Sequence, residues 1–108
     1  MSGPKSCALL GKWRITKSHL WDKAHLDLVE SAYILFEGKG HGEVTFGALN
    51  ARPDLEYAKT MVLFTWEGFE EMDEMRGSGS AELNNDGTIT IEFSYHYGDD
   101  AELTAKPW

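Results

Sequence analysis

The sequence has one cysteine, three prolines and only short apolar runs in its 108 residues. Cys7 alone cannot form a disulfide within the chain, so the fold depends on its own packed core, and a reducing compartment fits best. The apolar stretch from Cys7 to Leu10 is too short for the core of a signal peptide, and no stretch reaches the about 20 apolar residues of a membrane helix. We therefore expect a cytoplasmic protein with no membrane contact.

Basic residues are also scarce. Ten Lys and Arg residues stand against 18 Asp and Glu residues, which gives a net charge of −8. Binding to a phosphate backbone depends on clustered Lys and Arg that release counterions, so we do not expect DNA or RNA binding. The excess of carboxylates has two interpretations: it keeps a small protein in solution, or it docks onto a basic protein surface.

Apolar and aromatic residues are abundant, at 42% and 12% of the composition, which is typical of a globular chain the size of one domain. The longest β-favourable run is 60–68, and the most regular alternation of apolar and polar residues is 88–97. Such alternation predicts a half-buried strand. The residues on the apolar face of that strand are Ile89, Ile91, Phe93, Tyr95 and Tyr97.

Other segments have the same period or a β-rich composition. We expect further strands at 11–18, 32–37, 43–49, 55–57, 76–83 and 101–106. Turn signals separate several of them. The glycines of 38–42 supply positive φ values for a reversal, and Asn84-Asn85-Asp86-Gly87 is the clearest hairpin turn.

Three segments are predicted to interrupt the strands. Pro53 should break the pattern over 50–54, because proline cannot donate to a ladder. Residues 67–75 are expected to form an acidic connection, and 20–28 one or two helical turns within a loop. Gly77 and Gly79 would weaken a strand unless another backbone or a bulky side chain, such as one of the four tryptophans, packs closely over them.

Together these patterns predict one all-β domain. Seven or eight short strands with no long helix for parallel crossovers favour an antiparallel up-and-down meander. We expect it to close into a small barrel over residues 11–108, after a flexible segment at 1–10, because closure removes exposed edges. A β-sandwich is the alternative.

The start of the first predicted strand resembles known barrels. Gly11-Lys12-Trp13 is similar to the Gly-x-Trp opening of lipocalins and avidin-like barrels, and the resemblance implies that Trp13 plugs the barrel floor. The later lipocalin motifs are not found. More of the chain resembles a group of small uncharacterised bacterial proteins, a likeness that implies no activity. The shared pattern is Gly11-x-Trp13-x-Ile15, Trp21-Asp22, Phe64-x-Trp66-Glu67-Gly68, Gly77-x-Gly79 and His96-x-Gly98-Asp99.

The aromatic residues suggest the leading function. They either fill the interior of the barrel or line a pocket for one small ligand. We predict a non-enzymatic binding protein that holds a small, largely apolar molecule at the barrel mouth. The predicted apolar walls are Trp21, Trp66, Tyr95 and Tyr97, and the polar groups that orient the ligand are Glu67, Arg76 and His96.

The acidic segment suggests a second function. Its carboxylates lack the spacing of a calcium loop, and the four histidines lack the spacing of a zinc site, so we expect no metal. Instead, the segment could bind a basic protein as an interaction or inhibitor domain. The residues predicted to contact that partner are Phe69, Glu70, Glu71, Met72 and Asp73.

An enzyme is the third hypothesis. A histidine hydrogen-bonded to a carboxylate can act as a base, and His96 precedes Gly98-Asp99. No serine or cysteine lies in a nucleophile motif, and the glycines of 38–42 precede a strand instead of the helix that a dinucleotide site needs. We therefore expect no cofactor and favour a binding function over catalysis.

Overall fold

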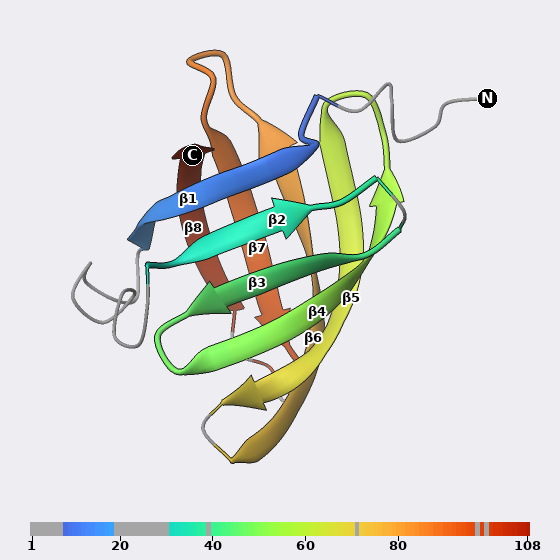
Figure 1. Cartoon of the computed structure of the whole chain (residues 1–108), viewed down its shortest axis with the longest axis vertical. Helices are drawn as coiled ribbons and strands as arrows, with labels where there is room; N and C mark the ends of the chain where they lie inside the picture. Colours follow the sequence, from blue (N-terminus) through green and yellow to red (C-terminus); the bar gives the residue numbers. More distant parts are fainter. Residues whose placement is uncertain (1–7, 19–30, 39, 71, 97, 99) are drawn as a thin grey trace.

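The computed structural model describes residues 8–18, 31–38, 40–70, 72–96, 98 and 100–108, and these form a closed barrel (Figure 1). Each strand pairs antiparallel with the next along the chain, and the last pairs with the first. The strands are β1 Gly11–Ser18, β2 Tyr33–Phe36, β3 Gly42–Phe46, β4 Leu49–Tyr57, β5 Met61–Glu70, β6 Asp73–Leu83, β7 Ile89–Tyr95 and β8 Asp100–Pro107. The all-β, up-and-down barrel is therefore confirmed, and the sandwich alternative is wrong.

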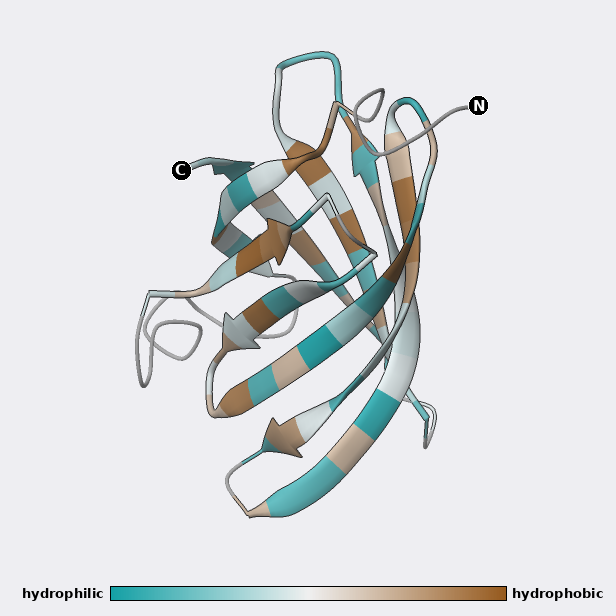
Figure 2. Ribbon diagram, turned by 45° about the vertical axis from the view of Figure 1, so that its right-hand side comes forward, coloured by the Kyte–Doolittle hydropathy of each residue, from teal (hydrophilic) through white to brown (hydrophobic). Residues whose placement is uncertain are grey.

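The core lies inside the barrel because side chains alternate between its two faces. In β7 the predicted inward residues Ile89, Ile91, Phe93 and Tyr95 are all buried, and Glu92 between them is exposed. Figure 2 shows the same alternation of hydrophobic and hydrophilic residues along the other strands. The period-two pattern thus predicts both the strands and the face that each residue occupies.

We expected Pro53 to interrupt the strand pattern, and this expectation is wrong. Pro53 lies within β4, and it pairs with Trp66 of β5. The amide of Leu55 donates to the carbonyl oxygen of Gly40, so the nitrogen of Pro53, two residues earlier, faces the same side, toward β3. The pairing of Val44 with Ala51 and the bridge between His41 and Asp54 share one register, so Pro53 lies opposite Gly42 and its missing N–H omits one bond between these two segments. β4 stays continuous because it pairs with β5 along its whole length.

The acidic segment 67–75 was predicted to connect two strands, and this prediction is also wrong. The segment forms the ends of β5 and β6, which continue past Glu67 and pair as far as Glu70 and Asp73. The reason is that the alternation continues through the charged residues: Glu67 and Phe69 are exposed, and Gly68 between them is not. Acidity here marks an outer face and not a loop.

The glycines of β6 have the close neighbours that we predicted. Gly77 pairs with Trp66 and Gly79 with Phe64 across the β5–β6 ladder. A Cβ at Gly77 would lie 1.8 Å from the Ser94 carbonyl oxygen and 3.0 Å from the Trp66 ring, and one at Gly79 would lie 2.6 Å from the Phe64 ring. Glycine therefore lets the aromatic rings lie flat against β6.

Two predicted segments fall wholly or mostly outside the described residues. These are the helical turns at 20–28 and most of the N-terminal segment 1–10, of which Ala8, Leu9 and Leu10 are described. Among the described residues, there is no helix that is long and apolar enough to cross a bilayer.

Candidate functional site

Residues 8–10, the first that the structure describes, lie at one end of the barrel, which we call the closed end. Trp13 is buried, and its indole N–H donates to the carbonyl oxygen of Leu9 at 2.8 Å. Leu9 is fully buried, and the amide of Ala8 donates to the carbonyl oxygen of Lys59 in the turn after β4. Trp13 therefore packs beneath a segment that is tied across the barrel, as its resemblance to a floor plug implies.

The opposite end, which we call the mouth, is where β1, β3, β5 and β7 end. An aromatic cluster occupies the interior toward this end, and Phe93 of β7 is its centre. The ring of Trp66 stacks on Phe93, with 4.5 Å between centroids and 20° between planes. Phe46 and Tyr95 meet Phe93 edge to face at 5.1 and 5.6 Å, and Phe64 lies at 6.1 Å. Such stacked and T-shaped pairs are the favourable arrangements of aromatic rings.

The polar atom of Trp66 is satisfied within the barrel wall. Its indole N–H donates to the carbonyl oxygen of Ser94 at 3.2 Å, and its ring meets Tyr95 at 87°. The side chain is 1% exposed, whereas Tyr95, the last residue of β7, is the most exposed of the cluster at 7%. Tyr95 is therefore the ring of this cluster that is most accessible to solvent.

The residues predicted to bind a ligand lie on both faces of the wall. Trp66 and Tyr95 point inward, and Glu67, Arg76 and His96 are exposed on the outside. Neighbours on one strand point to opposite faces, so the side chains of Trp66 and Glu67 lie on opposite sides of the wall. Trp21 and Tyr97 lie outside the described residues.

The same five residues nevertheless border one open groove on the outer wall, over β4 to β7. Glu67 and Arg76 stand opposite each other in the β5–β6 ladder, and the amide of His96 donates to the carbonyl oxygen of Arg76 at 2.8 Å. Asp54 lines the groove as well. The groove thus combines polar and charged groups with parts of Trp66 and Tyr95.

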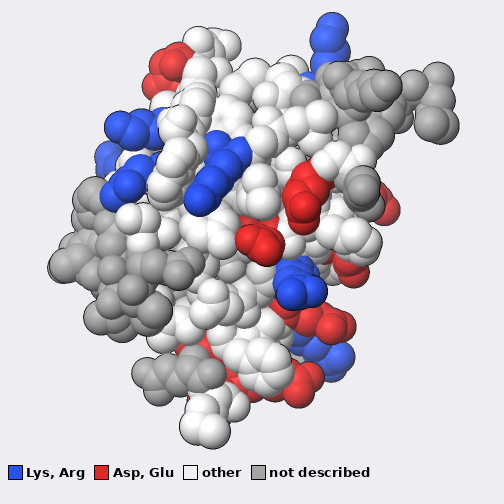
Figure 3. Space-filling model, viewed as in Figure 1, with Lys and Arg blue, Asp and Glu red and all other residues white. Residues whose placement is uncertain are grey.

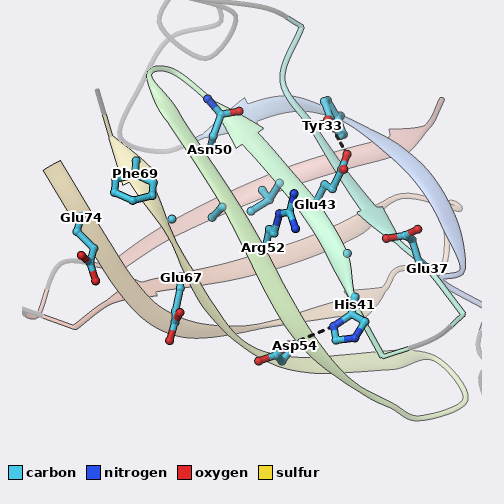
Figure 4. A pocket seen from close by; sticks show the side chains of 14 residues that line it. Tyr33, Glu37, His41, Glu43, Asn50, Arg52, Asp54, Glu67, Phe69 and Glu74 are labelled. Carbon is cyan, nitrogen blue, oxygen red and sulfur yellow. Dashed lines mark hydrogen bonds and ion pairs between the residues drawn. The ribbon is translucent and has the colours of Figure 1, made fainter. Parts of the chain in front are cut away.

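A second open groove, of about 960 Å³, crosses the outer faces of β2 to β6 (Figure 4). His41 and Asp54 form an exposed pair there at 3.3 Å, and the hydroxyl of Tyr33 donates to Glu43 at 3.0 Å. Arg52 projects among the carboxylates. We did not predict this groove, because its residues come from five strands and only the pairing register shows that they are neighbours.

The β5–β6 hairpin holds the residues predicted to contact a protein partner. Phe69 is 55% exposed and Met72 is 94% exposed, and Asp73 and Glu74 are exposed beside them. Glu70 is half-buried, and Glu71 lies outside the described residues. We call residues 67–74 the acidic hairpin. Its tip combines apolar side chains and carboxylates on a part of the sheet that projects from the barrel (Figure 1).

No cofactor or metal chemistry is indicated by the described side chains. Within the parts of the chain that the structure describes, no three His, Cys, Asp or Glu side chains are placed to hold a metal ion. His96 is exposed in the turn after β7, and Asp99 is not among the described residues. The catalytic hypothesis therefore stays a prediction.

Comparison with other proteins adds no relative. The sequence matches no protein-family model, and a search of curated proteins finds no similar sequence. The likeness to lipocalins and avidin-like barrels is one of architecture: eight antiparallel strands that close in chain order.

Proposed function

We propose that the protein binds a small, largely apolar molecule inside the barrel, at the mouth side of the aromatic cluster. The carrying observation is the group of rings packed around Phe93, with Trp66 stacked on it, inside a closed eight-stranded barrel. A barrel of this size holds either its own side chains or one small ligand. A flat apolar molecule would meet the same stacked and edge-to-face contacts that the rings make with each other.

Entry of such a ligand requires a movable side chain at the mouth. Tyr95 is the outermost of the buried rings on β7, and Met75 of β6 is partly buried against the core. Methionine is flexible and repacks readily, and a tyrosine ring can turn about two bonds. In this proposal Tyr95 and Met75 move aside, and Trp66 and Phe93 form the floor on which the ligand rests.

The outer groove has a separate role in the proposal. Glu67, Arg76 and His96 are exposed in the outer groove, so in this proposal they do not contact a ligand that lies inside the barrel. They would contact only a polar part of the ligand that extends over the rim of the wall. An entirely apolar ligand should therefore bind equally well when these three charges are removed.

The test measures binding of the apolar dye phenylnaphthylamine by fluorescence, together with native mass spectrometry of the freshly purified protein. Trp66→Phe should keep the fold and weaken dye binding by roughly three- to tenfold, because a stacked pair is worth about 0.5–1.5 kcal/mol. Phe69→Ala is the matched control, since Phe69 is an aromatic residue of the same strand on the outer face. Equal binding by both variants and the wild type would contradict the proposal.

A second candidate function, docking onto a basic protein surface, is favoured by the exposure of Phe69 and Met72 beside carboxylates of the acidic hairpin. Charges steer such an encounter and exposed apolar side chains contribute most of the affinity. The probe is a synthetic Lys-rich peptide that contains one tryptophan. Its binding should weaken with salt and be lost when Glu70, Glu71 and Asp73 are changed to Lys.

The matched control for the peptide changes three other exposed carboxylates, Glu56, Glu82 and Glu92, to Lys. This variant has the same net charge as the hairpin variant. If both sets of changes weaken the peptide equally, binding is a property of net charge and the hairpin is not its site.

A further inference from the structure

A surface of opposite character lies on the outer faces of β1, β2 and β8. The ammonium group of Lys12 lies 4.4 Å from the centre of the Tyr33 ring and 4.1 Å from that of Trp108. The guanidinium of Arg14 lies 5.5 Å from the Trp108 ring, and Lys106 stands opposite Arg14 in the β1–β8 ladder. We call these five residues the basic–aromatic patch.

The patch is exposed and held in place. Trp108 is 58% exposed, its amide donates to the carbonyl oxygen of Lys12, and its ring meets Tyr33 at 86°. Figure 3 shows Lys and Arg gathered on the side of the molecule where β1 and β8 lie, while Asp and Glu predominate toward the opposite side and the lower end. Cationic side chains and exposed aromatic rings therefore share one face, and Glu43, which accepts from the Tyr33 hydroxyl, lies at its border.

The arrangement of charges points to an anionic occupant. Arg14 and Lys106 stand opposite each other in the β1–β8 ladder, and Lys12 lies two residues from Arg14 on the same face of β1. Three cationic side chains are therefore gathered on this face. Lys12, between two rings, presents its charge beside exposed aromatic surface, so the patch fits an occupant that carries both carboxylates and apolar side chains.

The chain itself carries such an element. The acidic hairpin presents Phe69 and Met72 together with Glu67, Asp73 and Glu74. We propose that the basic–aromatic patch of one molecule binds the acidic hairpin of a second copy. This inference rests on the second candidate function and names the basic surface on which the hairpin docks.

The contact is head to tail. The hairpin belongs to β5 and β6, which lie across the closed barrel from β1, and it projects away from the patch in Figure 1. It therefore cannot reach the patch of its own molecule. Two different surfaces meet in each contact, so a pair of copies keeps one free patch and one free hairpin, and further association leads to a ring or an open chain.

The experiment is analytical ultracentrifugation of the whole chain over a range of concentrations, at low and at high ionic strength. The patch variant combines Lys12→Gln, Lys106→Gln and Trp108→Ala, and the hairpin variant combines Phe69→Ser, Asp73→Asn and Glu74→Gln. The wild type should associate at low salt, and each variant should associate at least about tenfold more weakly, because an exposed tryptophan or phenylalanine anchor is lost. Arg52→Gln with Lys59→Gln removes two exposed positive charges elsewhere and should associate like the wild type.

Mixing the two variants gives the decisive measurement. The patch variant keeps its hairpin and the hairpin variant keeps its patch, so the mixture should form a one-to-one dimer and no larger species. A mixture that stays monomeric while the wild type associates would overturn the head-to-tail contact. A wild type that stays monomeric would overturn self-association.

Binding of the Lys-rich peptide distinguishes failure of self-association from failure of the second candidate function, docking of the acidic hairpin onto a basic protein. Peptide binding at the hairpin without association of copies would reject the second copy as partner and keep hairpin docking on another basic protein. Loss of both would reject both proposals.

Discussion

Trp13 and Trp66 are both buried, and each indole donates to a backbone carbonyl, yet they stabilise different parts of the barrel. Trp13 bonds to Leu9, four residues away, and packs under the segment that covers the closed end. Trp66 bonds to Ser94, 28 residues away, and stacks in the cluster toward the mouth. One side chain fastens a local segment, and the other connects strands that are distant in the sequence.

The two tryptophans also differ in their cross-strand neighbours. Trp13 pairs with Ile34 and Pro107, and Trp66 pairs with Pro53 and Gly77. Of these four neighbours, only Gly77 has no side chain. The ring of Trp66 lies where β6 has no side chain. The closed end is thus filled by ordinary packing, and the mouth end depends on a glycine that makes space for a ring.

The largest expected effect comes from truncating either tryptophan. Trp13→Ala should lower the free energy of unfolding by about 3–5 kcal/mol, the usual cost of removing a buried aromatic side chain. The whole stability of a small domain is only about 5–15 kcal/mol, so urea unfolding should be measured also for Trp13→Phe, which stays folded but loses the bond to Leu9. Trp13→Phe should bind phenylnaphthylamine as the wild type does, in contrast to Trp66→Phe.

Equal loss of dye binding in Trp13→Phe and Trp66→Phe would remove the distinction between the two ends. It would mean that the dye reports the stability of the whole barrel and not a site at the mouth.

The strands were predictable because burial on one face leaves a period of two in the sequence, as in β7. The same rule also shows that the side chains of Trp66 and Glu67 face opposite sides of the wall. The groove over β4 to β7 nevertheless brings both residues together with Arg76, Tyr95 and His96. Pro53 was misjudged because one missing bond on the β3 side does not end a strand that pairs with β5 along its whole length. The outer grooves and the basic–aromatic patch depend on pairing register, which joins residues such as Arg14 and Lys106 that lie far apart in the chain.

A smaller loss of stability is expected at Gly77. Adding a side chain there tests whether the position opposite Trp66 must be a glycine. Gly77→Ala should lower the free energy of unfolding by about 1–3 kcal/mol, the usual cost of overpacking, because its Cβ would lie 1.8 Å from the Ser94 carbonyl oxygen. Ser78→Ala, at the exposed neighbouring position, should change stability by less than about 0.5 kcal/mol in the same urea measurement. Because the nearest atom is backbone and not the Trp66 ring, adding Trp66→Phe should not restore stability.

If Trp66→Phe does restore the stability of Gly77→Ala, the ring and not the β7 backbone sets the space at this position. The difference between Trp13 and Trp66 would then depend on the size of the Trp66 side chain.

The smallest effect is expected at Asp86, in the turn between β6 and β7 at the closed end. Its carboxylate accepts bonds from the Thr88 hydroxyl at 2.6 Å and the Thr88 amide at 3.0 Å, and these bonds lower the pKa of Asp86 from its ordinary value of 3.8. A lowered pKa in the folded state means that the carboxylate stabilises the fold at pH values above 3.8, and that this contribution is lost as the pH falls through the lowered pKa. The difference in unfolding free energy between the wild type and Asp86→Ala should therefore shrink on acidification, while dye binding at neutral pH stays unchanged in the variant. Thr88→Val removes the hydroxyl donor and should move the pKa of Asp86, followed by NMR, back toward 3.8; an unchanged titration would show that the hydroxyl bond does not hold this turn.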